Sequence, residues 1–292
     1  MDASALNPRI SHHVRSNSLP SKPHPLINQV DEQLVRLRDS EATSSSSSSL
    51  CHRLGALQDL HDCIDKLLLL PLSQQALIQL SDKELLDDLL EGSLRLLDSC
   101  DIAMNALLQT RECTNELESF LRRRRGEIGT ASSLQECLSS RKMIKKAIHK
   151  ALKGMESKQS HKDHGSLTIV NLVKEVEAVT YHSIESLLSF IAGPKMPSKW
   201  SCWSSVSKFV QPKRVACISE ETNISVVERL DLTLSSITNH HTNKSKSLIQ
   251  VEDMQNSLRE CGTSIKEVEE ELENLYRFII KTRVSLLNIF NH

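Results

Sequence analysis

Glycine, proline and aromatic residues are all scarce in this sequence, and their scarcity excludes several classes of fold. Glycine accounts for 8 of 292 residues, or about 3% against a usual value of roughly 7%. Proline also occurs eight times, and Phe, Trp and Tyr together make up 3%. A chain so poor in turn-forming residues lacks the many tight corners of a β-sandwich or barrel and the glycine-rich phosphate loops of nucleotide-binding folds. The composition therefore favours an all-α protein and disfavours most enzymes.

Long apolar runs and closely spaced cysteines are absent as well. The longest leucine run, Leu67–Leu70, ends at Pro71 and is far shorter than the ~18 residues needed to span a bilayer. The N-terminus has no hydrophobic signal-peptide core. The eight cysteines lie at least twelve residues apart, so no CxxC motif of a zinc or redox site is present. We therefore expect an intracellular, cytoplasmic protein with reduced cysteines. A plastid transit peptide in the basic, serine-containing N-terminus is the less favoured alternative.

Histidine occurs in two adjacent pairs, His12-His13 and His240-His241, without the spacing of a metal site. No HExxH, GxSxG or GxxxxGK[ST] motif occurs in the chain. We therefore assign no catalytic residue, no metal ligand and no cofactor. The stretch from Arg122 to Lys162 has twelve Lys or Arg against three Glu, but no interleaved aromatic residue. Binding of single-stranded nucleic acid by base stacking needs such residues, so we expect no nucleic-acid partner.

The composition divides the chain into a tail at residues 1–45 and a helical bundle at residues 46–292. Serine, proline and histidine are frequent in the first part, which we expect to be a disordered regulatory tail. One short apolar pattern within it is compatible with a helix, and its members are Leu26, Val30, Leu34 and Leu37. In the second part, apolar residues recur at helical spacing almost without interruption. The predicted fold is an all-α, elongated multi-helix bundle.

Capping signals divide part of this bundle into separate helices. Ser81–Glu84 has the pattern of a capping box and opens a helix that continues to Leu107. A further helix holds Leu117 and ends at the arginine run Arg122–Arg125. Ser133–Glu136 is a second capping box and opens the next helix. We therefore expect three separate helices in this region.

The C-terminal segment predicts one long helix with a heptad stripe. Its positions at 3-4 spacing are apolar except for one threonine, and they are Val251, Met254, Leu258, Cys261, Ile265, Val268, Leu272, Leu275, Ile279, Thr282, Leu286 and Ile289. Such a helix is roughly 58 Å long at 1.5 Å per residue, and its mean period of about 3.5 predicts packing at about +20° to its neighbours. From Tyr276 onward, extra apolar residues widen the stripe, so we expect that end to be buried among several helices. The stripe can pair within the chain or with another copy, and self-association through this helix stays open.

The tail contains a motif typical of a phosphoserine ligand for 14-3-3 proteins. Residues Arg15 to Pro20 read R-S-x-S-x-P. Phosphorylated Ser18 would present about −2 charge and three acceptor oxygens to an arginine cluster. Arg15 lies at −3, which suits a basophilic kinase, and Pro20 would turn the extended chain out of the groove. The alternative is a chance match in a serine-rich tail that has another use or none.

Four lysines form a candidate contact for anionic lipid or for a partner protein. Lys142, Lys146, Lys150 and Lys153 share one face of a predicted helix, where they would form a cationic ridge attracted to an anionic membrane surface. The alternative is a solvated face that pairs with the acidic blocks of the bundle itself.

The segment from Pro194 to Ser219 holds both tryptophans and no acidic residue. Trp200 and Trp203 begin a short amphipathic pattern with cationic flanks, which is typical of an interfacial membrane helix. The same pattern is typical of a tryptophan-anchored core helix between two prolines. Contact with a membrane or partner and interhelix packing are both compatible with it.

Four segments, in the same order along the chain, resemble motifs of the BYPASS-related family of land plants. They are His13–Ser21, Val30–Leu34 with the serine run that follows, Leu57–Asp62 and Thr282–Ile289. The resemblance covers essentially the whole chain. It implies a helical, non-enzymatic protein linked to root and shoot development, and the family offers no catalytic or ligand residues to carry over.

We therefore predict a non-enzymatic interaction and regulatory protein, in which a helical scaffold carries a phospho-regulated N-terminal tail. The expected partners are other proteins, with 14-3-3 proteins as candidates through Arg15–Pro20. The alternative function is a peripheral membrane or trafficking adaptor that binds anionic lipid through the basic ridge and the tryptophan segment.

Overall fold

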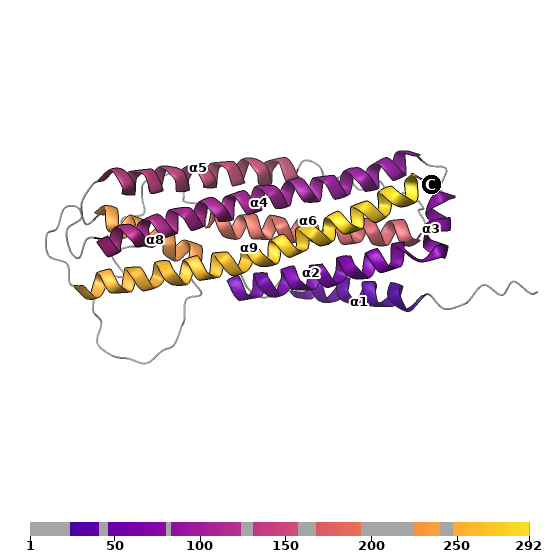
Figure 1. The fold of residues 1–292 in the computed structure, drawn as a ribbon, viewed down its shortest axis with the longest axis horizontal. Coiled ribbons are helices and arrows are strands. Elements are labelled where there is room, and N and C mark those ends of the chain that lie inside the picture. Colours follow the sequence, from indigo (N-terminus) through magenta and orange to yellow (C-terminus); the bar gives the residue numbers. More distant parts are fainter. Residues whose placement is uncertain are drawn as a thin grey trace, which may run out of the picture.

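The computed structural model describes residues 24–40, 46–79, 83–123, 131–156, 168–193, 225–239 and 248–291. All regular structure within these ranges is helical, which confirms the predicted all-α class. The helices described are α1 (Pro25–Asp39), α2 (Ser47–Leu68), α3 (Pro71–Ile78), α4 (Lys83–Arg123), α5 (Ala131–Glu156), α6 (Thr168–Ala192), α8 (Val226–Asn239) and α9 (Leu248–Phe290). Figure 1 shows them as an elongated bundle, with α3 at the end where the C-terminus lies. Within the ranges described, no helix is both long and apolar enough to cross a membrane.

The two longest helices, α4 with 41 residues and α9 with 43, run antiparallel through the bundle (Figure 1). α9 packs against α4 and α2, while α4 also packs against α5 and α6. α1 lies on α2 and α6, and α8 packs mainly on α9. At 1.5 Å per residue, α9 is about 65 Å long, so it extends along most of the bundle.

The heptad stripe of α9 forms part of the core, and the predicted continuous helix is confirmed. Nine of its residues are exposed by 5% or less: Leu258, Cys261, Ile265, Val268, Leu272, Leu275, Ile279, Leu286 and Ile289. They belong to one apolar cluster with the inward residues of α2 and α4. The heptad stripe therefore pairs within the chain, and its side chains are not free to bind a second copy.

The prediction of two separate helices between residues 83 and 123 is wrong, because α4 is continuous. Thr110, Cys113 and Thr114 lie between the two predicted segments, and they are buried on the inward face of α4. The hydroxyls of Thr110 and Thr114 donate to the carbonyls of Ala106 and Thr110 at 2.7 and 2.8 Å. No glycine or proline interrupts this stretch, so the helix continues through it.

The second capping box does not stand at the start of a helix. α5 begins at Ala131, so Ser133 lies within its first turn. Ser81 and Asp82 of the first capping box lie outside the described residues.

The helix α1 lies inside the segment that sequence analysis assigned to a disordered tail, so the tail boundary at residue 45 is too far along the chain. Pro25 stands in the first turn of α1, and the His24 ring accepts a hydrogen bond from the Leu26 backbone N–H at 3.3 Å. Val30, Leu34 and Leu37 are exposed by 3% or less because they pack in the apolar core with α2 and α6. Residues 25–39 therefore belong to the bundle.

Candidate functional site

The site residues predicted in the tail and in the tryptophan segment cannot be placed. Arg15, Ser18, Pro20, Trp200 and Trp203 all lie outside the described residues. The lysine ridge on α5 is described, and three further features of the bundle could serve a function: two buried polar clusters and an apolar stripe on the surface.

The four residues of the lysine ridge, Lys142, Lys146, Lys150 and Lys153, are all exposed on one side of α5. In the part of the chain that the structure describes, none of them forms an ion pair with an acidic side chain. Met143, which lies beside the ridge, is 65% exposed. The predicted common face is therefore present, and the ridge is available for contact with an anionic surface.

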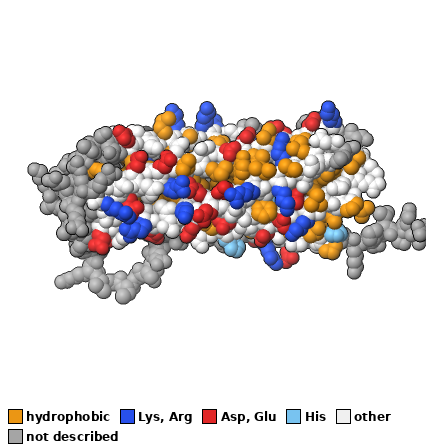
Figure 2. Space-filling view, in the orientation of Figure 1, with side chains coloured by type: hydrophobic (Ala, Val, Ile, Leu, Met, Phe, Trp, Pro, Cys, Tyr) orange, Lys and Arg blue, Asp and Glu red, His pale blue; other side chains and the backbone are white. Residues whose placement is uncertain are grey.

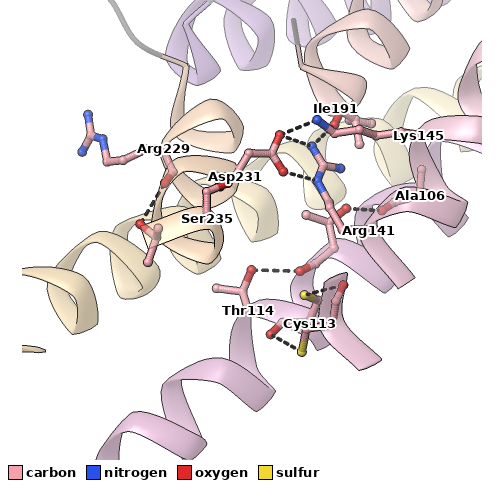
Figure 3. A network of polar contacts seen from close by, with 12 residues as sticks. Ala106, Cys113, Thr114, Arg141, Lys145, Ile191, Arg229, Asp231 and Ser235 are labelled. Atoms are coloured by element: carbon pink, nitrogen blue, oxygen red, sulfur yellow. Dashed lines mark hydrogen bonds and ion pairs between the residues drawn. The ribbon is translucent and has the colours of Figure 1, made fainter. Parts of the chain in front are cut away.

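The basic residues on the other side of α5 have a different role, shown in Figure 3. Arg141 is 3% exposed; its Nε donates to Asp231 Oδ1 at 2.8 Å, and one terminal nitrogen donates to the Ile191 carbonyl at 2.7 Å. Lys145 Nζ lies 2.7 Å from Asp231 Oδ2. These contacts join α5 to α6 and α8. The first polar cluster thus holds these three helices together.

The end of α6 is fitted to this cluster by a glycine. Gly193 follows Ala192 with a φ of 70°, and its N–H donates to the carbonyls of Ser189 and Phe190 at 3.1 Å. A Cβ at this position would lie 3.3 Å from Asp231 Oδ2. Glycine is therefore suited to this position both by its backbone conformation and by the space left beside the carboxylate.

Two buried thiols lie near the same cluster, at the contact of α4 with α5. The Sγ of Cys113 lies 3.8 Å from the Cys137 carbonyl, and the Sγ of Cys137 lies 3.9 Å from the Cys113 carbonyl. The hydrogen bond with Cys113 and burial raise the pKa of the Cys137 thiol. A thiol kept protonated in this way is a poor nucleophile, so Cys137 acts as a core residue.

The second buried polar cluster joins α2, α6 and α9 around His61. The His61 ring is 2% exposed, with Nε2 at 3.0 Å from Thr180 Oγ1 and Nδ1 at 3.4 Å from Thr282 Oγ1. Burial lowers the pKa of His61 to about 4, so the ring is neutral at physiological pH. One turn further along α2, Asp65 accepts a hydrogen bond from Ser285 at 2.5 Å and pairs with Lys281 Nζ at 3.0 Å. His61 and Asp65 are both fully engaged in holding helices together.

An apolar stripe lies on the surface where α4 and α9 run side by side, and Figure 2 shows apolar side chains gathered over these two helices. Its exposed members, which we call the α4–α9 stripe, are Leu94, Leu108, Ile280 and Val284, exposed by 40, 39, 39 and 47%. Leu97 and Tyr276 lie half-buried among them. The expectation that the widened end of α9 is buried among several helices is therefore wrong for Ile280 and Val284.

A polar groove continues the same seam toward the N-terminal half of α9. It has a volume of about 430 Å³, and its lining includes Arg111, Glu118, Arg259 and Lys266. Arg111 pairs with Glu269 at 2.8 Å, and Glu118 lies between Arg122 and Arg259. These charged groups neutralise one another across α4 and α9, so the groove has no strong preference for one sign of charge.

Sequence reasoning found the lysine ridge but missed the other features. Arg141 and Lys145 belong to the same basic segment as the ridge. Their only signal in the sequence was their i, i+4 spacing, which places them together on a different side of the helix from the ridge. Asp231, their partner, lies 90 residues away along the chain. The α4–α9 stripe had no separate signal, because an exposed leucine and a buried one look alike in sequence.

The comparison with family models gives one match. A model described as Protein BPS1 matches residues 53–289, about four-fifths of the chain. Two of the four motifs that resemble the family, Leu57–Asp62 and Thr282–Ile289, lie within this range, whereas the other two precede it. No curated protein and no solved structure matches the chain.

Proposed function

The chain belongs to the BPS1 family, and from this premise we propose that it is a non-enzymatic interaction protein that regulates root and shoot development in plants. In this proposal the bundle is a rigid scaffold in the cytoplasm, and the tail recruits a partner after phosphorylation of Ser18. The developmental role comes from the family resemblance of the sequence. The scaffold role is supported by the way the bundle uses its buried polar groups.

The observation that carries the proposal is that the ionisable groups of both polar clusters, buried or half-buried, contact other helices. Arg141 and Asp231 join α5, α6 and α8, and His61 and Asp65 join α2 with α6 and α9. A catalytic site needs such groups to face a substrate pocket. Groups engaged in interhelical contacts instead stiffen a bundle, which suits a docking platform.

The proposed recruitment of a partner by the tail is tested with isothermal titration calorimetry, which measures how tightly the phosphorylated full chain binds a 14-3-3 protein. Phosphate on Ser18 adds about −2 charge for the arginine cluster of the 14-3-3 groove. We expect the phosphorylated chain to bind at least about tenfold more tightly than the unphosphorylated one. Ser18→Ala, treated with the same kinase, should bind no better than the unphosphorylated chain.

The matched control for this experiment is Ser21→Ala, which removes a serine just beyond Pro20 and leaves the motif intact. It should bind like the wild type after phosphorylation. Equal binding by the phosphorylated wild type and the Ser18→Ala variant would refute the phospho-switch.

The developmental role is tested in plants that lack the protein. We expect altered root and shoot growth, restored by the wild-type gene. If the Ser18→Ala variant is present at normal levels but does not restore growth, the tail is needed for this role. Normal growth of plants without the protein would contradict the role.

A second candidate function, a peripheral membrane or trafficking adaptor, is favoured by the lysine ridge. Its four ammonium groups are exposed on one side of α5 and have no acidic partner in the described part of the chain. Basic residues near an anionic leaflet attract it electrostatically, and salt weakens the attraction. The test is flotation of the full chain with phosphatidylserine-containing vesicles at low and high salt, beside neutral vesicles.

For this function we expect salt-sensitive flotation that is lost in Lys146→Glu/Lys150→Glu. The charge-matched control is Lys83→Glu/Lys266→Glu, because both lysines are exposed on other helices. A Trp200→Ala/Trp203→Ala variant tests the second predicted contact in the same assay. Absence of flotation by the wild type, or equal loss in the control, contradicts the membrane function.

A further inference from the structure

The α4–α9 stripe is an apolar surface that nothing in the described part of the chain covers. Arg283 of α9 donates to the Leu90 carbonyl and to Ser93 Oγ of α4, the latter at 2.8 Å. Leu94 is the residue after Ser93, and Val284 is the residue after Arg283. Consecutive side chains of a helix are about 100° apart around its axis. Both side chains therefore point outward on the two sides of one seam, with Ile280 one turn before Val284.

The charges that flank the stripe differ on its two sides. Along α4, Asp98 and Asp101 are exposed, and neither forms an ion pair within the described residues. Along α9, the exposed cations beside the stripe are Lys281, which pairs with Asp62 and Asp65 of α2, and Arg277, which pairs with Glu273 on its own helix. Burial and the neighbouring Asp101 carboxylate raise the pKa of the Tyr276 hydroxyl, so Tyr276 and the adjacent Arg277 lie at the height of Asp101 along the bundle. Within the described part of the chain, the stripe thus has two carboxylates without an ion pair on its α4 side and, at the same level on its α9 side, a guanidinium held by Glu273 of its own helix.

A surface of this kind is complementary to itself. A two-fold axis parallel to the helices, lying in the contact plane, places α4 of one copy over α9 of the other at the same height. Leu94 then meets the partner's Val284 and the partner's Ile280, while Asp98 and Asp101 face the partner's Arg277. Every contact occurs twice, as in an isologous dimer. A basic peptide from another protein would satisfy only the anionic edge.

The size of the stripe agrees with a weak dimer. From Leu90 to Leu108, α4 rises about 27 Å, and two helices side by side are about 20 Å wide. The footprint is on the order of 500 Å² per copy, near the lower limit of specific interfaces. We propose that a second copy of this chain binds the α4–α9 stripe in a parallel two-fold dimer, with the acidic edge of each copy against Arg277 of the other.

This inference goes beyond the proposed function and does not need phosphorylation of the tail, so the two can fail separately. The experiment is sedimentation equilibrium of the unphosphorylated full chain, in a concentration series to about 100 µM. We expect a reversible monomer–dimer equilibrium in the wild type. Leu94→Glu/Val284→Glu should weaken dimerisation about tenfold or more, because it introduces four carboxylates into the contact.

Leu72→Glu is the matched control, because Leu72 is 75% exposed on α3, away from the stripe. It should dimerise like the wild type, and helical circular dichroism should be unchanged in all variants. A wild type that stays monomeric throughout the series overturns the proposal. So does a dimer that survives Leu94→Glu/Val284→Glu.

Charge exchange tests the orientation of the two copies. Asp98→Arg alone places two cations against each other, and Arg277→Glu alone places two anions against each other, so each variant should dimerise more weakly than the wild type. An equimolar mixture of the two variants restores an opposite charge at both contacts. It should therefore form heterodimers more readily than either variant forms homodimers. Equal association of the mixture and the separate variants overturns the parallel arrangement and, with it, the proposal.

Discussion

At the residue scale, the protein keeps several ionisable groups away from water and uses them as neutral or paired side chains. Glu177 of α6 is one of them. Burial raises the pKa of Glu177 to about 8, although Arg95 and Lys174 oppose the shift. Within the described residues its Oε1 is buried without a hydrogen-bond partner. Gly92 makes room for the carboxyl group, since a Cβ there would clash with Oε2. The carboxyl group is therefore mostly protonated in the folded protein at neutral pH.

The first prediction concerns the pH dependence of stability. The pKa of Glu177 is raised from 4.5 to about 8 in the folded protein. Its contribution to the stability of the fold is therefore fully present below about pH 4.5 and is lost as the pH rises toward about 8. Between pH 5 and pH 7, this group should lower the free energy of unfolding by about 2 kcal/mol. Glu177→Gln keeps the neutral shape and should remove that loss, measured by urea unfolding at pH 5, 6 and 7.

His61 acts in the opposite direction, because its pKa is lowered to about 4. Its contribution to stability is lost as the pH falls from about 6.5 to about 4. This effect is common to the wild type and Glu177→Gln, so the difference between the two proteins isolates Glu177. Parallel pH curves for the two would show that Glu177 ionises in the folded state as it does in the unfolded one.

At the element scale, each helix is held in the bundle by those of its side chains that contact other helices. α1 shows this most simply, because it carries five charged residues and buries only three apolar ones, Val30, Leu34 and Leu37. Two of its charged side chains pair at its surface: Arg36 with Glu32 in α1, and Arg38 with Glu175 of α6. Exposed pairs of this kind contribute little, so burial of the three apolar residues holds α1 on the bundle.

The second prediction tests α1 with two neighbouring residues. Leu34 is 1% exposed and Val35 is 54% exposed. Leu34→Ala should lower the free energy of unfolding by about 3 kcal/mol, because it removes buried methyl groups and leaves a cavity. Val35→Ala should change it by less than about 0.5 kcal/mol. Similar small effects in guanidinium unfolding would mean that α1 is not part of the cooperative bundle.

The third prediction tests the end of α6. Gly193→Ala should destabilise the protein by about 1 kcal/mol, because alanine is strained at a φ of 70° and its Cβ would approach the Asp231 carboxylate. Gly154→Ala is the control: Gly154 lies in α5, and an alanine Cβ there would have no neighbouring atom within 4 Å. That change should stabilise the protein by about 0.5 kcal/mol through helix propensity. Thermal unfolding of the two variants should therefore shift in opposite directions, and a shift in the same direction would contradict this account.

At the scale of the whole molecule, the fold is closed by contacts between its two ends. Gln58 Nε2 of α2 donates to the Glu271 backbone carbonyl at 3.0 Å and to its carboxylate at 2.7 Å. Lys281 of α9 reaches Asp62 and Asp65 of α2 at 3.2 and 3.0 Å. More than 200 residues separate these partners along the chain. α2 and α4 consequently lack one side of their core until α9 is in place.

The fourth prediction follows from this arrangement. A chain that ends at residue 247 lacks α9, so the apolar faces of α2 and α4 are exposed to water. It should bind the dye ANS and lose the cooperative thermal transition. A chain that begins at residue 24 retains every described helix, and it should unfold like the full chain. A cooperative transition in the shorter chain without α9 would show that the remaining helices form a core by themselves.

Part of this protein is determined by its sequence alone. The scarcity of glycine and proline and the 3-4 spacing of apolar residues predicted the all-α class, the continuous helix from Val251 to Ile289 and the common face of the lysine ridge. These properties are local, because the period of a helix decides which residues share a face. The pattern Leu26, Val30, Leu34 and Leu37 also fitted a helix, although composition placed it in the tail.

The tertiary structure decided what local patterns leave open. Arg141 is buried and Lys142 is exposed because Asp231, 90 residues away, lies over one side of α5. Ile280 and Val284 reach the surface, whereas Ile279 and Leu286 are buried, because α2 and α4 cover only one side of α9. Burial depends on which helices become neighbours, and that is a property of the whole chain. The α4–α9 stripe therefore exists only in the folded molecule.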